Sequence, residues 1–582
     1  MSILIKTVRI AGFRGLENLE VELEQTTVLT GMNNTGKTSF LKALQIVLGN
    51  RQFVSQDDFF IKDSHCAKQI TIDVLIVPVA DGKQSDDFSE DWEALFTTDR
   101  IRTDGIKSFL PLRTTVTFNA IKNSYKVQQT ILKEWPAYKD GDTDWFDAGK
   151  GNKTTFRFDE LPFFYMDAQR DILEDTKLRS SYLGKMLSKI EYSTDDIKAI
   201  EQQIEQLNEK AVSSSDILSN IKETLKGLDS ALDNQSSGIE ITPFTKKIRD
   251  LNKGLTIYYG DSQDSFSMEY HGMGTRSWSS LLTLKSFIGL LASNADKEKT
   301  VFFPVLAIEE PEAHLHPNAQ KQLYNQINSI AGQKIISTHS PYIAAVAELR
   351  QIRNFYKEQV VYCGRVAIDT LDDEAQRKIK RQVINTRGEI FFSKLMVLFE
   401  GETEEQALPI FTKHHFGQSA VEMGIDFIGV GGYGNYLPFL RFAESLHIPW
   451  LILSDAESKT VKSVKEQFKK NDSSKKESDL IVFLDEGNDF EKQLIADGFQ
   501  DEIKHALIER GEYHSEQHKK AKAAEIQAYG DKQLYELIIA AKTQFAPVIA
   551  EKIVKSDKKL PPKVLELFSR ISSTLNIAKE VS

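Results

Sequence analysis

A glycine-rich segment with the composition of a phosphate-binding loop occupies Gly31-Met32-Asn33-Asn34-Thr35-Gly36-Lys37-Thr38. It follows a strand-like run, residues 27–30, and precedes a helix that we predict over residues 39–48. Glycines let backbone N–H groups turn toward phosphate oxygens, Lys37 reaches the terminal phosphates, and Thr38 can bind Mg²⁺. The alternative is a turn without a ligand, which the strand–loop–helix context disfavours. The predicted ATP contacts in this loop are Asn33, Asn34, Thr35, Gly36, Lys37, Thr38 and Ser39.

Two later strand-like runs end in groups that could act on a bound nucleotide. The run Val305-Leu306-Ala307-Ile308 ends in Glu309 and Glu310. One carboxylate of such a pair can hold Mg²⁺ while the other polarises the attacking water, so we assign Glu309 to the metal and Glu310 to catalysis. The second run, residues 334–338, ends at His339. Taken alone, the two acids would be a solvated turn and the histidine a structural donor, but the phosphate-binding loop favours the functional interpretation.

A second group of acids follows strand-like runs in the last third of the chain. Residues 394–399 lead into Glu400, then a glycine, then a helix that carries Glu404. Residues 450–454 lead into Asp455 and Glu457, whose side chains can reach one divalent ion. For Glu400 and Glu404 alone, an acidic helix start stabilised by the helix dipole explains the pattern equally well.

The order of phosphate loop, acidic strand and strand-end histidine resembles the ABC ATPase family, whose switch histidine senses the γ-phosphate. That resemblance gives His339 a catalytic role. Gly272 and Gly274, in a segment ahead of a leucine-rich helix, match the position of the ABC signature, although the letters differ from Leu-Ser-Gly-Gly-Gln. Gln169 matches the Q-loop glutamine. The resemblance implies ATP shared at a dimer interface, and Phe13-Arg14-Gly15 resembles recombination and SMC-type ATPases.

The later acids resemble the Toprim domain of topoisomerases, primases and nucleases, with Glu457 in place of the second Asp of its Asp-x-Asp motif. An ABC ATPase with an internal helical insertion and a final Toprim domain resembles the OLD (overcoming lysogenization defect) family of nucleases. The resemblance implies DNA as the substrate and Mg²⁺, Mn²⁺ or Ca²⁺ at two sites. Glu400, Glu404 and Asp455 would hold one ion. Glu457 and Glu491 would support the second, and Lys542, at the start of a short helix, would stabilise the negative charge that develops during cleavage.

The predicted fold is α/β, an ABC-type P-loop ATPase with a helical dimerisation insertion, followed by a C-terminal Toprim α/β domain. Ile197, Ile200, Ile204 and Leu207 give the insertion its helical period. We predict the charged stretch 371–381 to be a linker. The predicted boundaries are residues 1–165 and 251–380 for the ATPase, 166–250 for the insertion and 381–582 for the Toprim domain.

Composition narrows the class of protein. The 582 residues carry a formal net charge of −11, which argues against indiscriminate coating of nucleic acid. Two cysteines provide neither a disulfide framework nor a zinc site, and no apolar run is long enough to cross a bilayer, so we expect a cytoplasmic protein without membrane contact. The lysine-rich segment 459–476 is predicted to be a loop. Such loops are usually just solvated, yet this one is the best candidate for contact with a phosphate backbone.

These features predict an ATP-regulated, divalent-metal-dependent DNA endonuclease that forms a homodimer or a higher homo-oligomer. The family resemblance implies a role in antiphage defence, alone or with a helicase or a retron RNA–DNA partner. The alternative is an ATPase clamp or scaffold that binds nucleic acid without cleaving it, for which Glu457 is the sequence support. A topoisomerase or primase is weaker, because no further domain provides a catalytic tyrosine or a zinc ribbon.

Overall fold

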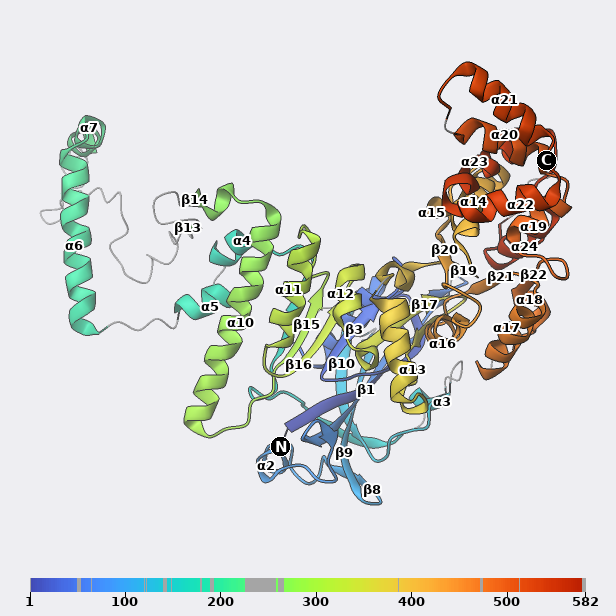
Figure 1. The fold of residues 1–582 in the computed structure, drawn as a ribbon. Coiled ribbons are helices and arrows are strands. Elements are labelled where there is room, and N and C mark those ends of the chain that lie inside the picture. The colour runs from blue at the N-terminus through green and yellow to red at the C-terminus, as the bar shows by residue number, and fades with distance from the viewer. Residues whose placement is uncertain are drawn as a thin grey trace, which may run out of the picture. The chain divides into compact units, whose positions relative to one another are not determined.

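The chain divides into two compact units in the computed structural model, Met1–Phe158 with Val305–Glu309 and Gln333–Ser582, and Asp159–Pro304 with Glu310–Gly332. Each unit is described by itself (Figure 1). No helix among the described residues is both long and apolar enough to span a membrane. The structure describes residues 2–49, 54–63, 65–119, 121, 123–139, 144–147, 149–177, 181–188, 193–225, 258–259, 266–385, 387–471, 475–511 and 513–577.

A largely parallel sheet in the first unit carries the phosphate-binding loop. Its strands β15, β16, β3 and β17 are parallel neighbours in that order, and β18 closes the edge antiparallel to β17. Strands β3, β15 and β16 are buried along their whole length, which explains their continuous apolar runs. Their carboxyl ends share one edge, so the loop, Glu309 and His339 meet there. The bounds are β3 (Thr26–Thr30), β15 (Val305–Glu309), β16 (Gln333–Ser337), β17 (Ile352–Lys357) and β18 (Val361–Gly364), and the loop leads into α1 (Lys37–Val47).

An antiparallel sheet accompanies it in the same unit. Its main path runs β11-β10-β9-β6-β1-β2, and the longest pairing is that of β1 with β6, followed by those of β6 with β9 and of β9 with β10. The inward faces of β1 and β6 are almost entirely apolar and buried. The bounds are β1 (Ser2–Phe13), β2 (Leu16–Glu22), β6 (Gln69–Ala80), β9 (Lys107–Asn119), β10 (Ser124–Leu132) and β11 (Gly151–Thr154).

The second unit is mainly helical. The predicted helical character of the insertion is confirmed for α6 (Thr194–Ser213) and α7 (Asp216–Leu225), and Ser193 caps α6 by accepting from the Asp196 N–H. Residues 226–250 of the predicted insertion lie outside the described residues. The longest helix, α10 (Met273–Glu298), begins at the glycines assigned to the signature. The dimerising role of the insertion stays a prediction.

The Toprim region is a four-stranded parallel sheet in the order β20-β19-β21-β22, covered by helices. One hydrophobic cluster includes residues of β19 and β21 together with α14, α23 and α24, so the sheet and the last helices form a single core. The bounds are β19 (Leu395–Phe399), β20 (Ile425–Gly429), β21 (Trp450–Ser454), β22 (Ile481–Phe483), α14 (Glu402–Phe416), α16 (Tyr436–Leu446), α17 (Ser458–Lys470), α19 (Phe490–Ala496), α20 (Gln500–Arg510), α21 (Glu516–Gln527), α22 (Asp531–Ala540), α23 (Lys542–Lys555) and α24 (Pro562–Thr574).

The predicted loop at 459–476 is wrong, and the segment predicted to be a linker has regular structure. The predicted linker is helical, with α13 (Asp373–Lys378) running into a π-helical turn (Ile379–Ile384) whose apolar residues are buried. Most of the lysine-rich segment is the helix α17, because Thr460, Val464 and Phe468 recur at helical spacing and are buried beneath the lysines. In both segments a short apolar stripe outweighs the dense charge.

Candidate functional site

The phosphate-binding loop has the backbone that its glycines predict. Gly31 has φ 121°, and a Cβ there would lie 2.1 Å from the carbonyl oxygen of Phe355, so only glycine fits. Gly36, with φ 97°, precedes the first turn of α1. Lys37 is buried, and its Nζ donates to the carbonyl oxygens of Gly31 at 2.7 Å and of Met32 at 2.8 Å. The ammonium group therefore lies against the inner side of the loop.

Thr38 and Glu309, the two predicted Mg²⁺ ligands of the nucleotide site, are in direct contact. The Thr38 hydroxyl donates a hydrogen bond to Glu309 Oε1. Glu309 is buried at the end of β15, whereas Thr38 is exposed at the start of α1. Asn33 and Asn34 are also exposed, as nucleotide contacts require. The contact joins two segments that are far apart in the sequence at the place where the motif needs a metal.

His339 lies beside Lys37 at the same edge of the sheet. Burial, together with the positive charge of Lys37, lowers the pKa of His339 to about 4. The imidazole is therefore neutral at pH 7 and can both donate and accept a hydrogen bond. The structure thus brings together Lys37, Thr38, Glu309 and His339.

Glu310 and Gln169 belong to the second unit. Glu310 has φ 42°, a left-handed conformation that is uncommon outside glycine and concentrates at functional sites. Gln169 is exposed, and its neighbour Arg170 is buried and donates through Nη2 to the carbonyl oxygen of Pro311 at 2.6 Å. Burial lowers the pKa of Arg170 to about 10, against the opposing effect of acids that include Glu312 and Glu310. Arg170 was not predicted from the sequence, because its role in holding the segment after Glu310 is visible only from its contact with Pro311 in the fold.

The signature segment forms the N-terminus of α10. A Cβ on Gly274 would lie 2.4 Å from the carbonyl oxygen of His314, so this glycine permits close backbone packing. Gly272 is exposed at the helix N-cap, where free N–H groups favour an anion. The neighbouring Arg276 makes a two-pronged ion pair with Asp171, with Nε donating to Oδ1 at 2.9 Å. This pair holds the start of α10 against the segment that carries Gln169.

The first two Toprim carboxylates, Glu400 and Glu404, are separated by a short segment that begins with Gly401. Glu400 follows β19 directly, and Gly401 is the N-cap of α14. A Cβ on Gly401 would lie 2.9 Å from Glu404 Oε2, so the absence of a side chain lets the Glu404 carboxylate turn back over the strand end. Glu404 is only 4% exposed.

Asp455 completes this cluster from the end of β21. Ser454 Oγ donates to Glu400 Oε1 at 3.3 Å and so links the ends of β19 and β21. Asp455 Oδ1 is buried without a hydrogen-bond partner among the described residues. Burial, together with the negative charges of Glu404 and Glu400, raises the pKa of Asp455 to about 9. Burial likewise raises the pKa values of Glu400 and Glu404 to about 7. The three carboxylates destabilise one another's charged forms, which a cation would relieve.

The donor set fits a hard divalent cation. All three donors are carboxylates, which suit Mg²⁺, Mn²⁺ or Ca²⁺. Asp455 Oδ1, which has no hydrogen-bond partner among the described residues, is available as a ligand atom for such an ion. Within the described part of the chain, no three His, Cys, Asp or Glu side chains are already gathered closely enough to hold a metal. Glu457 is exposed at the N-cap of α17. Binding a metal therefore requires side-chain movements that bring these carboxylates closer together.

Glu491 and Lys542 form an ion pair beside this cluster. Lys542 Nζ lies 3.0 Å from Glu491 Oε1, and Glu491 also accepts from Thr403 Oγ1 at 2.5 Å. Glu491 is 1% exposed and Lys542 is 37% exposed, so the acid is fixed while the lysine reaches solvent. The predicted helix start at Lys542 is confirmed. Glu491 thus orients Lys542, and its predicted part in a second metal site stays a prediction.

Two further residues border the carboxylates and were not predicted. Tyr436, at the start of α16, is fully buried, and its hydroxyl has no hydrogen-bond partner in the described residues. Asp489 caps α19 and accepts from the Tyr535 hydroxyl at 2.5 Å. Asp489 could have been predicted, because it precedes the predicted site residue Glu491 by two positions. Nothing in the sequence around Tyr436 indicates that it lies beside the carboxylates.

Comparisons with known proteins find an ATPase domain followed by a TOPRIM domain. Residues 4–344 match the family model described as an AAA ATPase domain, and residues 391–456 match the TOPRIM domain of overcoming lysogenization defect protein-like sequences. An OLD nuclease of Thermus scotoductus is 25% identical over 480 residues, covering 78% of this chain and 82% of that protein. The Old nuclease of Escherichia phage P2 is 22% identical, covering 78% of each chain. The endonuclease GajA of Bacillus cereus is 24% identical, covering 68% of this chain and 66% of its own.

Proposed function

Because this chain belongs to the AAA ATPase family and, through its OLD-like Toprim domain, to the OLD family, we propose that it is an ATP-regulated, divalent-metal-dependent DNA endonuclease. The observation that carries the proposal is the cluster of Glu404, which is buried, with Glu400 and Asp455, which are partly buried. Holding three mutually repelling carboxylates largely out of solvent is costly unless a cation binds them. A purely structural site would have placed apolar or neutral residues at these strand ends.

The residues in and around the cluster would divide phosphodiester hydrolysis into metal binding, charge stabilisation and positioning. Glu400, Glu404 and Asp455 would hold the metal, which when bound activates a water and neutralises charge on the phosphate. Lys542, oriented by Glu491, presents a cation that stabilises the negative charge developing on the scissile phosphate. Ser454, at the end of β21, donates to the carboxylate of Glu400, at the end of β19, and so preserves the spacing between the two strand ends.

The nucleotide site is proposed to regulate cleavage. Lys37 and Thr38 would bind the phosphates of ATP and Mg²⁺, Glu309 would complete the Mg²⁺ ligands, and Glu310 with His339 would serve hydrolysis. The N-terminus of α10, with Gly272 and Gly274, would contact nucleotide held by a second copy, which makes the active form a homodimer or a higher homo-oligomer. Regulation then follows from subunit association around ATP.

The cellular setting is also a proposal. We propose a cytoplasmic protein of antiphage defence, acting alone or with a helicase or retron RNA–DNA partner. The relatives named as OLD nucleases and as the endonuclease GajA support the nuclease part of this proposal. One observation favours the second candidate, an ATPase scaffold that binds nucleic acid without cleaving it. The Toprim carboxylates are not gathered as metal ligands in the described residues, and the exposed Glu457 replaces an aspartate.

Plasmid cleavage by the purified full chain distinguishes the two candidates. The wild type is incubated with Mg²⁺ or Mn²⁺ beside Glu400→Gln and Asp455→Asn, each with no nucleotide, with ATP, and with a non-hydrolysable analogue. We expect cleavage by the wild type only and a rate that changes with nucleotide. Equal inactivity of the wild type and both variants with every metal and with linear, nicked and single-stranded substrates overturns the nuclease proposal.

A further inference from the structure

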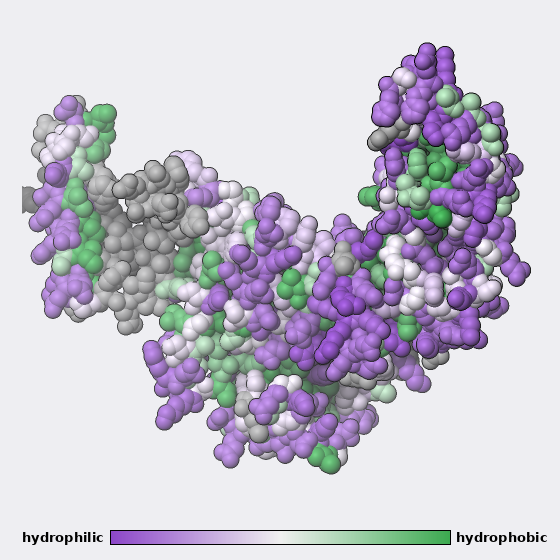
Figure 2. All heavy atoms as spheres, viewed as in Figure 1, coloured by the Kyte–Doolittle hydropathy of each residue, from purple (hydrophilic) through white to green (hydrophobic). Residues whose placement is uncertain are grey.

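A face of lysines runs along α17 and begins next to the carboxylate cluster. The helix starts after Glu457, two residues beyond Asp455, and extends over 13 residues. Thr460, Val464 and Phe468 bury the opposite side, which leaves the lysines in solvent. Figure 2 shows hydrophilic residues over the place where Figure 1 labels α17. The exposed lysines of the face are Lys459, Lys462, Lys465, Lys469 and Lys470, with Glu466 among them.

Most of these lysines carry unbalanced charge. Lys465 pairs with Glu477 at 3.1 Å. Within the part of the chain that the structure describes, the other four lysines form no ion pair and no hydrogen bond through their ammonium groups. In a protein with a net charge of −11, four unpaired cations on one side of a helix are a local exception. Such a stripe next to a metal site attracts a polyanion.

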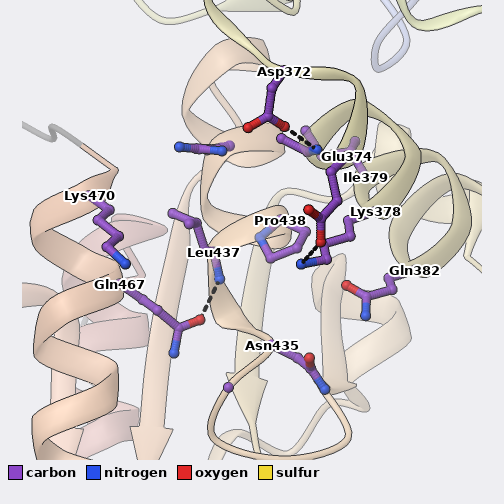
Figure 3. A pocket seen from close by; sticks show the side chains of 13 residues that line it. Asp372, Glu374, Lys378, Ile379, Gln382, Asn435, Leu437, Pro438, Gln467 and Lys470 are labelled. Carbon is purple, nitrogen blue, oxygen red and sulfur yellow. Dashed lines mark hydrogen bonds and ion pairs between the residues drawn. The ribbon is translucent and has the colours of Figure 1, made fainter.

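The far end of α17 borders a polar hollow that adds another cation. Arg441 of α16 and Lys470 line it, and so do Asp372, Glu374 and Lys378 at and after the start of α13. Figure 3 shows Lys470 on one side of the hollow and Lys378 on the other. Lys378 is engaged by Glu374 at 2.8 Å, whereas Arg441 forms no ion pair among the described residues. The cations without an ion pair therefore continue from α17 to Arg441 on α16, in a hollow that also contains the carboxylate of Asp372.

An exposed aromatic ring lies beside the stripe. Tyr433 is 44% exposed, in the glycine-rich turn after β20, and its carbonyl oxygen accepts from Ser463 Oγ at 3.2 Å and from Gln467 Nε2 at 2.7 Å. Gln467 Oε1 also accepts from the Leu437 N–H at 3.0 Å, so the turn and α16 are fastened to α17. Aromatic rings among cations are typical of surfaces on which unpaired bases stack while the backbone follows the charge.

We infer that the lysine face of α17, together with Arg441 and Tyr433, is the surface along which a DNA strand lies as it enters the carboxylate cluster. The inference rests on the proposed function and specifies how that site receives its substrate. The helix is about 20 Å long, which spans about six nucleotides at the rise of B-DNA. The lysines contact phosphates without reading sequence, and Tyr433 stacks on a base only where the strand is unpaired.

DNA binding by two matched variants of the full chain tests the lysine face. One variant carries K459Q, K462Q, K469Q and K470Q. The control carries the same charge change at exposed lysines of the last helices and their connections, K519Q, K520Q, K532Q and K559Q. Fluorescence anisotropy with labelled duplex and single-stranded oligonucleotides is measured in EDTA over a salt series, so that cleavage does not interfere.

We expect the α17 variant to bind at least tenfold more weakly and to lose about 2 to 4 from the slope of log affinity against log salt. The control should stay within twofold of the wild type. Tyr433→Ala should weaken single-strand binding by about fivefold or more and leave duplex binding unchanged, and Tyr433→Phe should restore it. If the quadruple variant does not fold, the pairs K459Q/K462Q and K469Q/K470Q are tested in the same way.

The outcomes distinguish a failure of the α17 inference from a failure of the nuclease proposal. If the wild type binds and cleaves DNA and the α17 variant retains its affinity and salt slope, the α17 inference is wrong and the nuclease proposal stands. An equal loss in the control would also overturn the inference, because it would reduce the effect to total charge. A wild type that binds DNA through α17 without cleaving it would instead refute the nuclease proposal and leave the binding surface intact.

Discussion

The side-chain amide of Asn354 donates a hydrogen bond through Nδ2 to the backbone carbonyl oxygen of Leu446, 2.9 Å away in a buried position. Its Oδ1 accepts from Thr30 Oγ1 at 3.0 Å, and Thr30 is the last residue of β3 before the phosphate-binding loop. Leu446 is the last residue of α16, whose first residue, Tyr436, lies beside the Toprim carboxylates. One helix therefore links the strand that holds the nucleotide loop to the predicted metal site.

Asn354→Leu should weaken the control of cleavage by ATP. The substitution leaves Thr30 Oγ1 and the Leu446 carbonyl without this partner, which should cost about 1–3 kcal/mol of stability. ATP affinity should change little, because Asn354 is not a predicted nucleotide contact, while the ratio of cleavage rates with and without ATP should move toward one. Cleavage assays beside ATP titrations check this. An unchanged ratio in a folded variant would show that α16 does not transmit the signal.

The parts of the fold and of the candidate site that could be predicted are those formed by residues close together in the sequence. The phosphate loop, Glu309 and the Glu400–Glu404 pair were predicted because strand, turn and helix are adjacent in the sequence. Asn354 and Tyr436 were not, because their roles come from partners that are distant in the chain. The α17 segment was predicted to be a loop because lysines outnumber the three buried residues at helical spacing, Thr460, Val464 and Phe468. Local motifs thus indicate the candidate site residues, whereas the contacts that link the two sites are visible only in the tertiary packing.

The metal-free protein should lose stability as pH rises. Glu400 and Glu404 have folded pKa values of about 7 and Asp455 of about 9, above the values near 4 expected when unfolded. The folded state therefore holds more protons than the unfolded state between about pH 4 and 9, and the contribution of these groups falls across that range. Urea unfolding in EDTA at pH 6, 7 and 8 measures the slope. Asp455→Asn should flatten it, and an equal slope in that variant would contradict the assignment.

Added Mn²⁺ should raise the melting temperature more at pH 8 than at pH 6. Metal binding requires deprotonated carboxylates, so protons compete with the ion at lower pH. The Glu404→Gln variant should show little of this gain at either pH, since it removes one of the predicted ligands. Thermal melts with and without Mn²⁺ check the prediction. A gain that is independent of pH, or that persists in Glu404→Gln, would indicate that the ion binds elsewhere.

Tyr436→Phe should leave the metal-free protein as stable as the wild type or stabilise it by up to about 1 kcal/mol, because the buried hydroxyl lies near Ser454 but forms no hydrogen bond of ordinary geometry among the described residues. Burial and the nearby Glu400, Glu404 and Asp455 raise the pKa of Tyr436, so the hydroxyl stays protonated and could donate to a carboxylate once a metal orders the cluster. Titration calorimetry should therefore show weaker Mn²⁺ binding in this variant. Destabilisation by more than 1 kcal/mol in EDTA would instead reveal a hydrogen bond already present without metal.

Lys542→Met and Glu491→Gln should not be additive. Removing Lys542 leaves Glu491 buried without its cation, which should cost about 1–3 kcal/mol, less than for a fully buried pair because Lys542 is 37% exposed. Glu491→Gln keeps the acceptor for Thr403, so the double variant should be more stable than the sum of the two single losses predicts. Urea unfolding of all four proteins gives the coupling energy, and cleavage assays should show Lys542→Met inactive and Glu491→Gln impaired. A coupling near zero would mean that Glu491 does not hold Lys542 in place. In that case Glu491 would be free to serve as a metal ligand, and its loss should lower Mn²⁺ affinity.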